Sequence, residues 1–225
     1  MRHETGDMSE TSDARPQDLT SHVNPASRVS RLTSCSLASH VSRLSSSQAL
    51  RFTLKAWPVI AVATIGLCVL TQQAAKLFGI DLPDQQNVEL VRSWLTRAFE
   101  SPKAFSVAAS LVAQVVLLMP AIEECVFRWL LFHFPGKMVG RALRARRGEA
   151  GVLALPLAAA GSSTLFSAAH YIAQPWPDAA FLALFFFGLA QCWLYNKTQR
   201  LWCAMLNHAL FNLTNIVLLF IVPLP

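Results

Sequence analysis

Five long stretches of this chain carry no charged side chain. They cover residues 56–75, 104–122, 150–177, 179–196 and 201–225. Each is close to, or longer than, the roughly 20 mostly apolar residues with which a helix crosses the hydrocarbon core of a bilayer. Hydrophobic residues make up 53% of the chain and charged residues 14%, whereas an ordinary soluble domain is about 25% charged. We therefore expect an all-α, polytopic membrane protein.

The expected architecture is a transmembrane helical bundle. Its predicted spans cover about residues 54–75, 104–132, 152–173, 179–196 and 201–222. Residues 85–99 form a further segment in which charges alternate with large side chains such as Trp94, Leu95 and Phe99. This pattern favours an amphipathic helix in the membrane interface. The prediction is thus about five spans with one possible interfacial helix.

Residues 1–50 differ in composition from the rest of the chain, because they are rich in Ser, Arg and Thr and poor in large apolar side chains. Such a segment cannot bury enough apolar surface to offset its ordering entropy, so we expect a disordered basic tail. An organelle transit peptide has the same character and stays open as an alternative, whereas a cleavable signal peptide is not apparent. The predicted division is a tail over 1–50 and a transmembrane domain over 51–225.

Basic residues indicate the orientation of the spans. The tail with Arg51 and Lys55, the expected 133–149 loop, and the turn after residue 196 together hold 14 of the 19 basic residues. A five-span chain places these three segments on one side of the membrane, and the positive-inside rule makes that side cytoplasmic. The same rule accounts for the net charge of +6, so no nucleic-acid partner is expected. The five cysteines show no disulfide or zinc spacing.

The second expected span ends in charged residues that a membrane helix does not carry without a reason. Glu123, Glu124 and Arg128 directly follow an uncharged run, although an ionised side chain near the centre of a span costs roughly 2.5–3.5 kcal/mol. Glu124 and Arg128 are four residues apart and share a helix face, where they can form an ion pair that locks helices together. Glu123 has no basic neighbour at helical spacing and can face elsewhere.

Two further polar pairs lie at the same four-residue spacing in later spans. Phe166 precedes His170 in the third span, and His208 precedes Asn212 in the fifth. Each pair on its own is compatible with packing or with interhelical hydrogen bonding. Together with Glu123 they supply a carboxylate, two imidazoles and a carboxamide from three spans, which suits a base for water and donors for an oxyanion.

In this order, the motifs Glu123-Glu124-x-x-x-Arg128, Phe166-x-x-x-His170 and His208-x-x-x-Asn212 resemble those of the CPBP family. This family comprises CAAX proteases and bacteriocin-processing enzymes, is also called the ABI family, and includes the eukaryotic Ras-converting prenyl endopeptidase. The resemblance covers about residues 104–222. Phe127, Gly188 and Asn207 agree with it, whereas Trp129 stands where a glycine is common.

The resemblance implies an endopeptidase that hydrolyses a peptide bond of a membrane-associated or lipidated protein with a glutamate-activated water, without a cofactor or a metal. By position, Glu123 is the implied general base, and His170 helps to hold the water. His208 and Asn212 form the implied oxyanion hole, which Glu124, Arg128 and Phe166 support. The implied location is a bacterial inner membrane, crossed several times with a cytoplasmic N-terminus, and the oligomeric state is not predicted.

Other classes of protein stay open from the residues alone. Glu123, His170 and His208 are suitable zinc ligands, although the His-Glu-x-x-His signature is absent, and chelator sensitivity would decide. The small residues 161–164 with a later histidine allow a serine rhomboid reading. A non-enzymatic protein for bacteriocin self-immunity or ligand binding is the third alternative.

Overall fold

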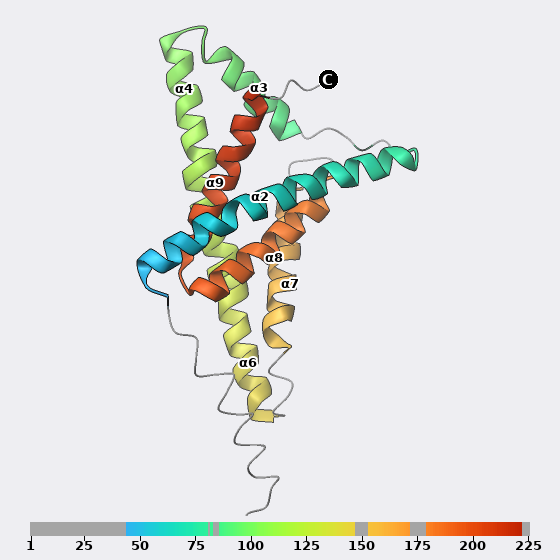
Figure 1. Ribbon diagram of the computed structural model, residues 1–225, viewed down its shortest axis with the longest axis vertical. Coiled ribbons are helices and arrows are strands. Elements are labelled where there is room, and N and C mark those ends of the chain that lie inside the picture. The colour runs from blue at the N-terminus through green and yellow to red at the C-terminus, as the bar shows by residue number, and fades with distance from the viewer. Residues whose placement is uncertain (1–43, 81, 83–85, 147–152, 172–178, 222–225) are drawn as a thin grey trace, which may run out of the picture. The chain divides into compact units, whose positions relative to one another are not determined.

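The computed structural model describes residues 44–80, 82, 86–146, 153–171 and 179–221, which belong to one compact unit spanning residues 43–225 (Figure 1). In this described part the chain forms helices and no strand, so the expected all-α fold is confirmed. Residues 1–43, the greater part of the expected tail, lie outside the described residues. The helices are α2 (Ser46–Leu77), α3 (Gln86–Arg97), α4 (Pro102–Ala113), η1 (Gln114–Leu118), α5 (Met119–Glu124), η2 (Cys125–His133), α6 (Phe134–Arg146), α7 (Ala154–Ala169), α8 (Ala180–Thr198) and α9 (Leu201–Ile221).

Helix α2 begins earlier than the sequence pattern predicts, so residues 46–50 belong to this helix and not to the tail. The cause is a capping box. The Ser45 hydroxyl accepts from the backbone N–H of Gln48 at 3.3 Å, and the Gln48 side chain accepts from the backbone N–H of Ser45 at 2.9 Å. Together they satisfy two of the N–H groups that a helix start leaves without a partner.

A single helical run extends from Pro102 to Arg146, because α4, η1, α5, η2 and α6 follow one another without a break. It starts at Ser101, whose hydroxyl accepts from the Ala104 N–H at 3.1 Å, with a proline at the first helical position. The expectation of a loop over 133–149 is wrong for residues 134–146, which form α6. This segment loses its apolar character but keeps strong helix formers such as Met138, Ala142 and Leu143.

Three helices are long and apolar enough to cross a membrane: Ser46–Leu77, Pro102–Arg141 and Leu201–Leu219. These agree with the first, second and fifth expected spans. The third expected span is represented by α7, a shorter apolar helix, and the fourth by α8. The segment expected to be an interfacial helix is helical as α3. The fold is therefore that of an all-α membrane bundle, while the number of passes stays a prediction.

The bundle is held together by contacts of α8 with α2, α7 and α9, and of α9 with α2, η1 and α5. Gln199, in the left-handed region at φ 53°, ends α8 and lets α9 begin two residues later. The buried core joins Ile60 and Ala61 of α2 to one aromatic side chain from each of three helices. These are Phe166 of α7, Phe187 of α8 and Phe211 of α9, and the rings of Phe166 and Phe187 contact the ring of His208, which is described next.

Candidate active site

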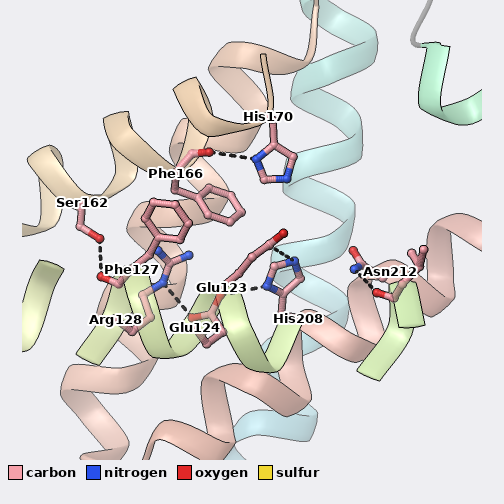
Figure 2. A network of polar contacts seen from close by, with 10 residues as sticks. Glu123, Glu124, Phe127, Arg128, Ser162, Phe166, His170, His208 and Asn212 are labelled. Atoms are coloured by element: carbon pink, nitrogen blue, oxygen red, sulfur yellow. Dashed lines mark hydrogen bonds and ion pairs between the residues drawn. The ribbon is translucent and has the colours of Figure 1, made fainter. Parts of the chain in front are cut away.

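The most deeply buried part of the site is an ion pair between two side chains of one helical run. The Arg128 Nε atom lies 2.9 Å from Glu124 Oε2, and both side chains are completely buried (Figure 2). The pair joins the end of α5 to η2, a π-helical segment, so the four-residue spacing keeps both side chains on one face. Because both side chains are buried, water screens the attraction between the two opposite charges less than it would at the surface. The predicted pairing of Glu124 with Arg128 is thus present.

His208 of α9 connects both glutamates. Its Nδ1 atom lies 2.9 Å from Glu124 Oε1, and its Nε2 atom lies 3.6 Å from Glu123 Oε2. An ionised carboxylate can only accept, so with Glu124 ionised beside Arg128 the imidazole donates from Nδ1. The Nε2 atom is then directed toward Glu123. The Glu123 side chain is 19% exposed, whereas that of Glu124 is 0% exposed.

His170 stands at the C-terminal end of α7, with its ring beside Phe166 (Figure 2). Its Nδ1 atom lies 2.9 Å from the Phe166 carbonyl oxygen, which can only accept. A neutral His170 therefore has its proton on Nδ1 and a free acceptor at Nε2. The Phe166 ring contacts His170 and His208 with centroid distances of 4.7 and 5.8 Å, and the Arg128 guanidinium lies 4.8 Å above it. Phe166 thus contacts side chains of all three motifs.

The side chain of Asn212 is held by a backbone carbonyl of the π-helical segment η1. Its Nδ2 atom donates to the Val115 carbonyl at 2.9 Å, to one side of the Glu123–His208 contact (Figure 2). Val115 lies in η1, where the Met119 N–H donates to Gln114, five residues earlier. The matching partner for Val115 would be residue 120, a proline without an N–H. The Val115 carbonyl is therefore available to the amide of Asn212.

A comparison with protein families agrees with this arrangement. Residues 90–214, more than half of the chain, match the family model described as type II CAAX prenyl endopeptidase Rce1-like. The chain belongs to the Rce1-like family. No curated protein and no solved structure matches it. Membership makes the chain an integral membrane protein of an intramembrane protease family, with the lipid bilayer and a membrane-associated peptide substrate as its partners.

The matched range, residues 90–214, spans the positions of all three motifs. The departure at Trp129 is compatible with the buried pair, because the Trp129 side chain is 51% exposed whereas Glu124 and Arg128 are 0% exposed. The buried residue next to it in the chain is Arg128. A glycine at position 129 is therefore not needed for the ion pair in this member of the family.

Sequence reasoning missed three contacts of the site. It did not predict the Glu124–His208 hydrogen bond, whose partners are 84 residues apart. It did not single out Phe187, whose ring lies 5.0 Å from that of His208. It considered Ser162 only as a member of the small-residue run, whereas the Ser162 hydroxyl donates to the Phe127 carbonyl at 2.6 Å. Only Ser162 carried a signal, as a polar residue in an apolar helix.

The zinc alternative requires at least three suitable side chains in one place. Among the residues that the structure describes, no group of three His, Cys, Asp or Glu side chains is arranged to hold a metal ion. In the serine alternative, Ser162 is engaged by the Phe127 carbonyl, and Ser163 is buried against Gly188 of α8. Both serines therefore have contacts that serve helix packing.

Proposed function

We propose that this chain is a glutamate-dependent intramembrane endopeptidase, in which Glu123 activates the water that attacks the peptide bond. The observation that carries the proposal is the contrast between the two glutamates. Glu124 is completely buried and engaged by Arg128 and His208. Glu123 is partly exposed, and its Oε2 atom lies 3.6 Å from the Nε2 atom of the same histidine. Only Glu123 has both access and free lone pairs for a water molecule.

In the proposed reaction, the water oxygen attacks the carbonyl carbon of the scissile bond while Glu123 takes one of its protons. His170 assists by orienting the water, since the Nε2 atom of its neutral ring can accept a hydrogen bond from the other O–H, whose hydrogen stays on the attacking oxygen. The proton held by Glu123 then passes to the leaving nitrogen, so the carboxylate is regenerated when the bond breaks. Glu123 thus acts first as a base and then as an acid within one turnover.

The developing oxyanion needs two donors. His208 can donate from Nε2 only when its ring is protonated at both nitrogens, because Nδ1 already donates to Glu124. Asn212 has two N–H bonds on Nδ2, of which one is directed to Val115. Among the described residues no partner is found for the other, and the first fixes its direction. In this proposal the buried Glu124–Arg128 pair orients His208 and does not touch the substrate.

The proposed substrate is a membrane-associated or lipidated protein or peptide. The test is a Glu123→Gln variant, in which the side chain keeps its size but cannot take a proton. Membrane and secreted peptides from cells with the wild-type and variant proteins are compared, and peptides that accumulate uncleaved in the variant identify substrates. A variant that retains its cellular role with an unchanged peptide profile would favour a binding or bacteriocin-immunity protein instead.

A further inference from the structure

A hollow outside the proposed active site lies between the end of α3 and the start of α4. Its volume is about 350 Å³, within the range of small-molecule sites. It is lined by Trp94, Arg97, Ser101, Lys103, Ala104 and Val107, with the buried Ala108 at its base. The end of α3 and the start of α4 meet at the turn between them (Figure 1), so the hollow lies at the end of the longest apolar helical run among the described residues.

A second, nearly filled space shares Trp94 and Ala108 with the lining of this hollow. There, an apolar seam joins Val91 and Leu95 of α3 to Leu111 and Val112 of α4 and to Ile216 of α9. The remaining space in the seam is about 10 Å³, no more than one water molecule occupies. The side chains of α3 and α4 therefore fill most of the space at the seam, whereas the hollow beside it is lined in part by the small side chains of Ala104 and Ala108.

The rim of the hollow is positively charged. Arg97 and Lys103 are both exposed, and among the described residues no carboxylate, including the nearby exposed Glu100, is within ion-pair distance of either. The first turn of α4 contains no acidic residue and carries Lys103. The positive end of the α4 helix dipole therefore adds to the positive charge of Arg97 and Lys103. An anion placed between the cations would relieve this repulsion.

The surroundings of the rim are apolar. Phe105 and Val107 on α4 are 59% and 52% exposed, and Phe99 at the turn is 80% exposed. An occupant with an anionic head and apolar tails matches both parts of this surface. We propose that the hollow binds an anionic phospholipid of the bilayer, with its phosphate between Arg97 and Lys103, the Trp94 ring beside its glycerol region, and its acyl chains along the exposed face of α4.

The test measures lipid binding and does not require cleavage, so its outcome is independent of the proposed function. The purified protein in neutral detergent is titrated with phosphatidylglycerol or with phosphatidylcholine, and bound lipid is counted by native mass spectrometry. The double variant Arg97→Gln/Lys103→Gln should bind phosphatidylglycerol roughly 10- to 30-fold more weakly. Its affinity for phosphatidylcholine should be much less affected.

The matched control removes one lysine and one arginine elsewhere. Lys137→Gln/Arg141→Gln, two exposed positions of α6, should leave phosphatidylglycerol binding at the wild-type level. An Ala104→Leu variant keeps the charges but fills the hollow, and it should weaken binding as well. Equal losses in both double variants would reduce the effect to diffuse charge and overturn the proposal.

A second outcome would also overturn it. If Arg97→Gln/Lys103→Gln binds phosphatidylglycerol normally but raises KM only for substrates with a free C-terminal carboxylate, the hollow belongs to the substrate and not to a lipid. Helix content, followed by circular dichroism, should be unchanged in all variants, because none of the substituted residues is a helix cap.

Discussion

Glu123 and Glu124 are neighbours in the chain with different surroundings, and substitutions should separate them. Glu124→Gln leaves the buried Arg128 without its charge partner, and breaking a buried pair in this way typically costs about 3–5 kcal/mol. We expect a lower apparent Tm and a lower folded yield for this variant. Glu123→Gln should fold at the wild-type level, because Glu123 is partly exposed and has no arginine partner.

Thermal unfolding in detergent, followed by tryptophan fluorescence, measures both effects. Leu118→Met, an exposed and volume-conserving change in the same helical run, provides the baseline for handling losses. Equal decreases in Tm for the two glutamate variants would contradict the proposed division of roles.

Asn212 should act on the transition state. Removing one oxyanion donor typically lowers turnover about 100- to 1000-fold. We expect Asn212→Ala to lose turnover by about that factor while substrate affinity is retained, since the amide is not proposed to bind the ground state. Single-turnover cleavage in detergent, with the Kd measured separately, tests this. A variant that cleaves at the wild-type rate but binds substrate more weakly would make Asn212 a docking residue.

His208→Ala gives a comparable loss in this scheme. The double variant should lose much less than the product of the two single losses, since groups that act as a unit are not additive. Full additivity would mean that the two side chains act in separate steps.

At the scale of elements, the π-helical segment η1 is expected to fix the direction of Asn212. In Pro120→Ala, residue 120 gains an N–H that can compete for the Val115 or Val116 carbonyl. Stability should stay the same or rise, because a proline within a helix is costly. Turnover should decrease by up to about 100-fold, the size of effect that a misplacement of roughly 1 Å produces.

Pro58→Ala in α2 is the matched control, since it also removes a proline from a long apolar helix but lies on another element. It should keep the wild-type turnover. If Pro120→Ala is as active as this control, the available Val115 carbonyl has no part in positioning Asn212.

The close contact between α7 and α8 depends on a glycine, Gly188, at the point where α8 meets Ser163 of α7. A Cβ atom at Gly188 would lie 2.9 Å from Ser163 Cβ and 3.0 Å from Ser163 Cα. We expect Gly188→Ala to lower stability by about 1–3 kcal/mol, because overpacking forces the helices apart. Gly161→Ala should be neutral or stabilising, since a Cβ there meets nothing within 4 Å.

The same thermal measurement can include a compensating change. Adding Ser163→Gly to Gly188→Ala returns the space and should restore part of the lost stability. No recovery in the double variant would show that the decrease has another cause.

At the scale of the whole molecule, the distribution of basic residues predicts that the N-terminal tail and α6 both face the cytoplasm. A single cysteine at Lys137 in a cysteine-free background should not be labelled by a membrane-impermeant reagent in intact cells. A cysteine at Glu100 should be labelled from outside. Inside-out vesicles should give the opposite pattern, and labelling of residue 137 in intact cells would reverse the orientation.

The helices of this molecule could be predicted because their signal is local. Charge-free intervals identify α2, the Pro102–Arg141 run and α9, and the Glu124–Arg128 pair follows from spacing along one helix. The contact of His208 with both glutamates could not be predicted in this way, since it depends on how α9 crosses α5. The extent of α6 was also missed, because hydropathy detects lipid-facing residues, whereas the backbone hydrogen bonds of a helix do not require them.

The unbroken Pro102–Arg141 helix has a further consequence for how this molecule meets its surroundings. Its 40 residues correspond to about 60 Å at 1.5 Å per residue, roughly twice the thickness of the hydrocarbon core. Such a helix tilts, or extends into the aqueous phase, and thinner or thicker lipid changes how far it does so. Because Glu123 lies near its middle, the depth at which the carboxylate sits varies with that tilt. Under the proposed mechanism, acyl-chain length would then select which peptide bond of a membrane-associated substrate reaches the carboxylate.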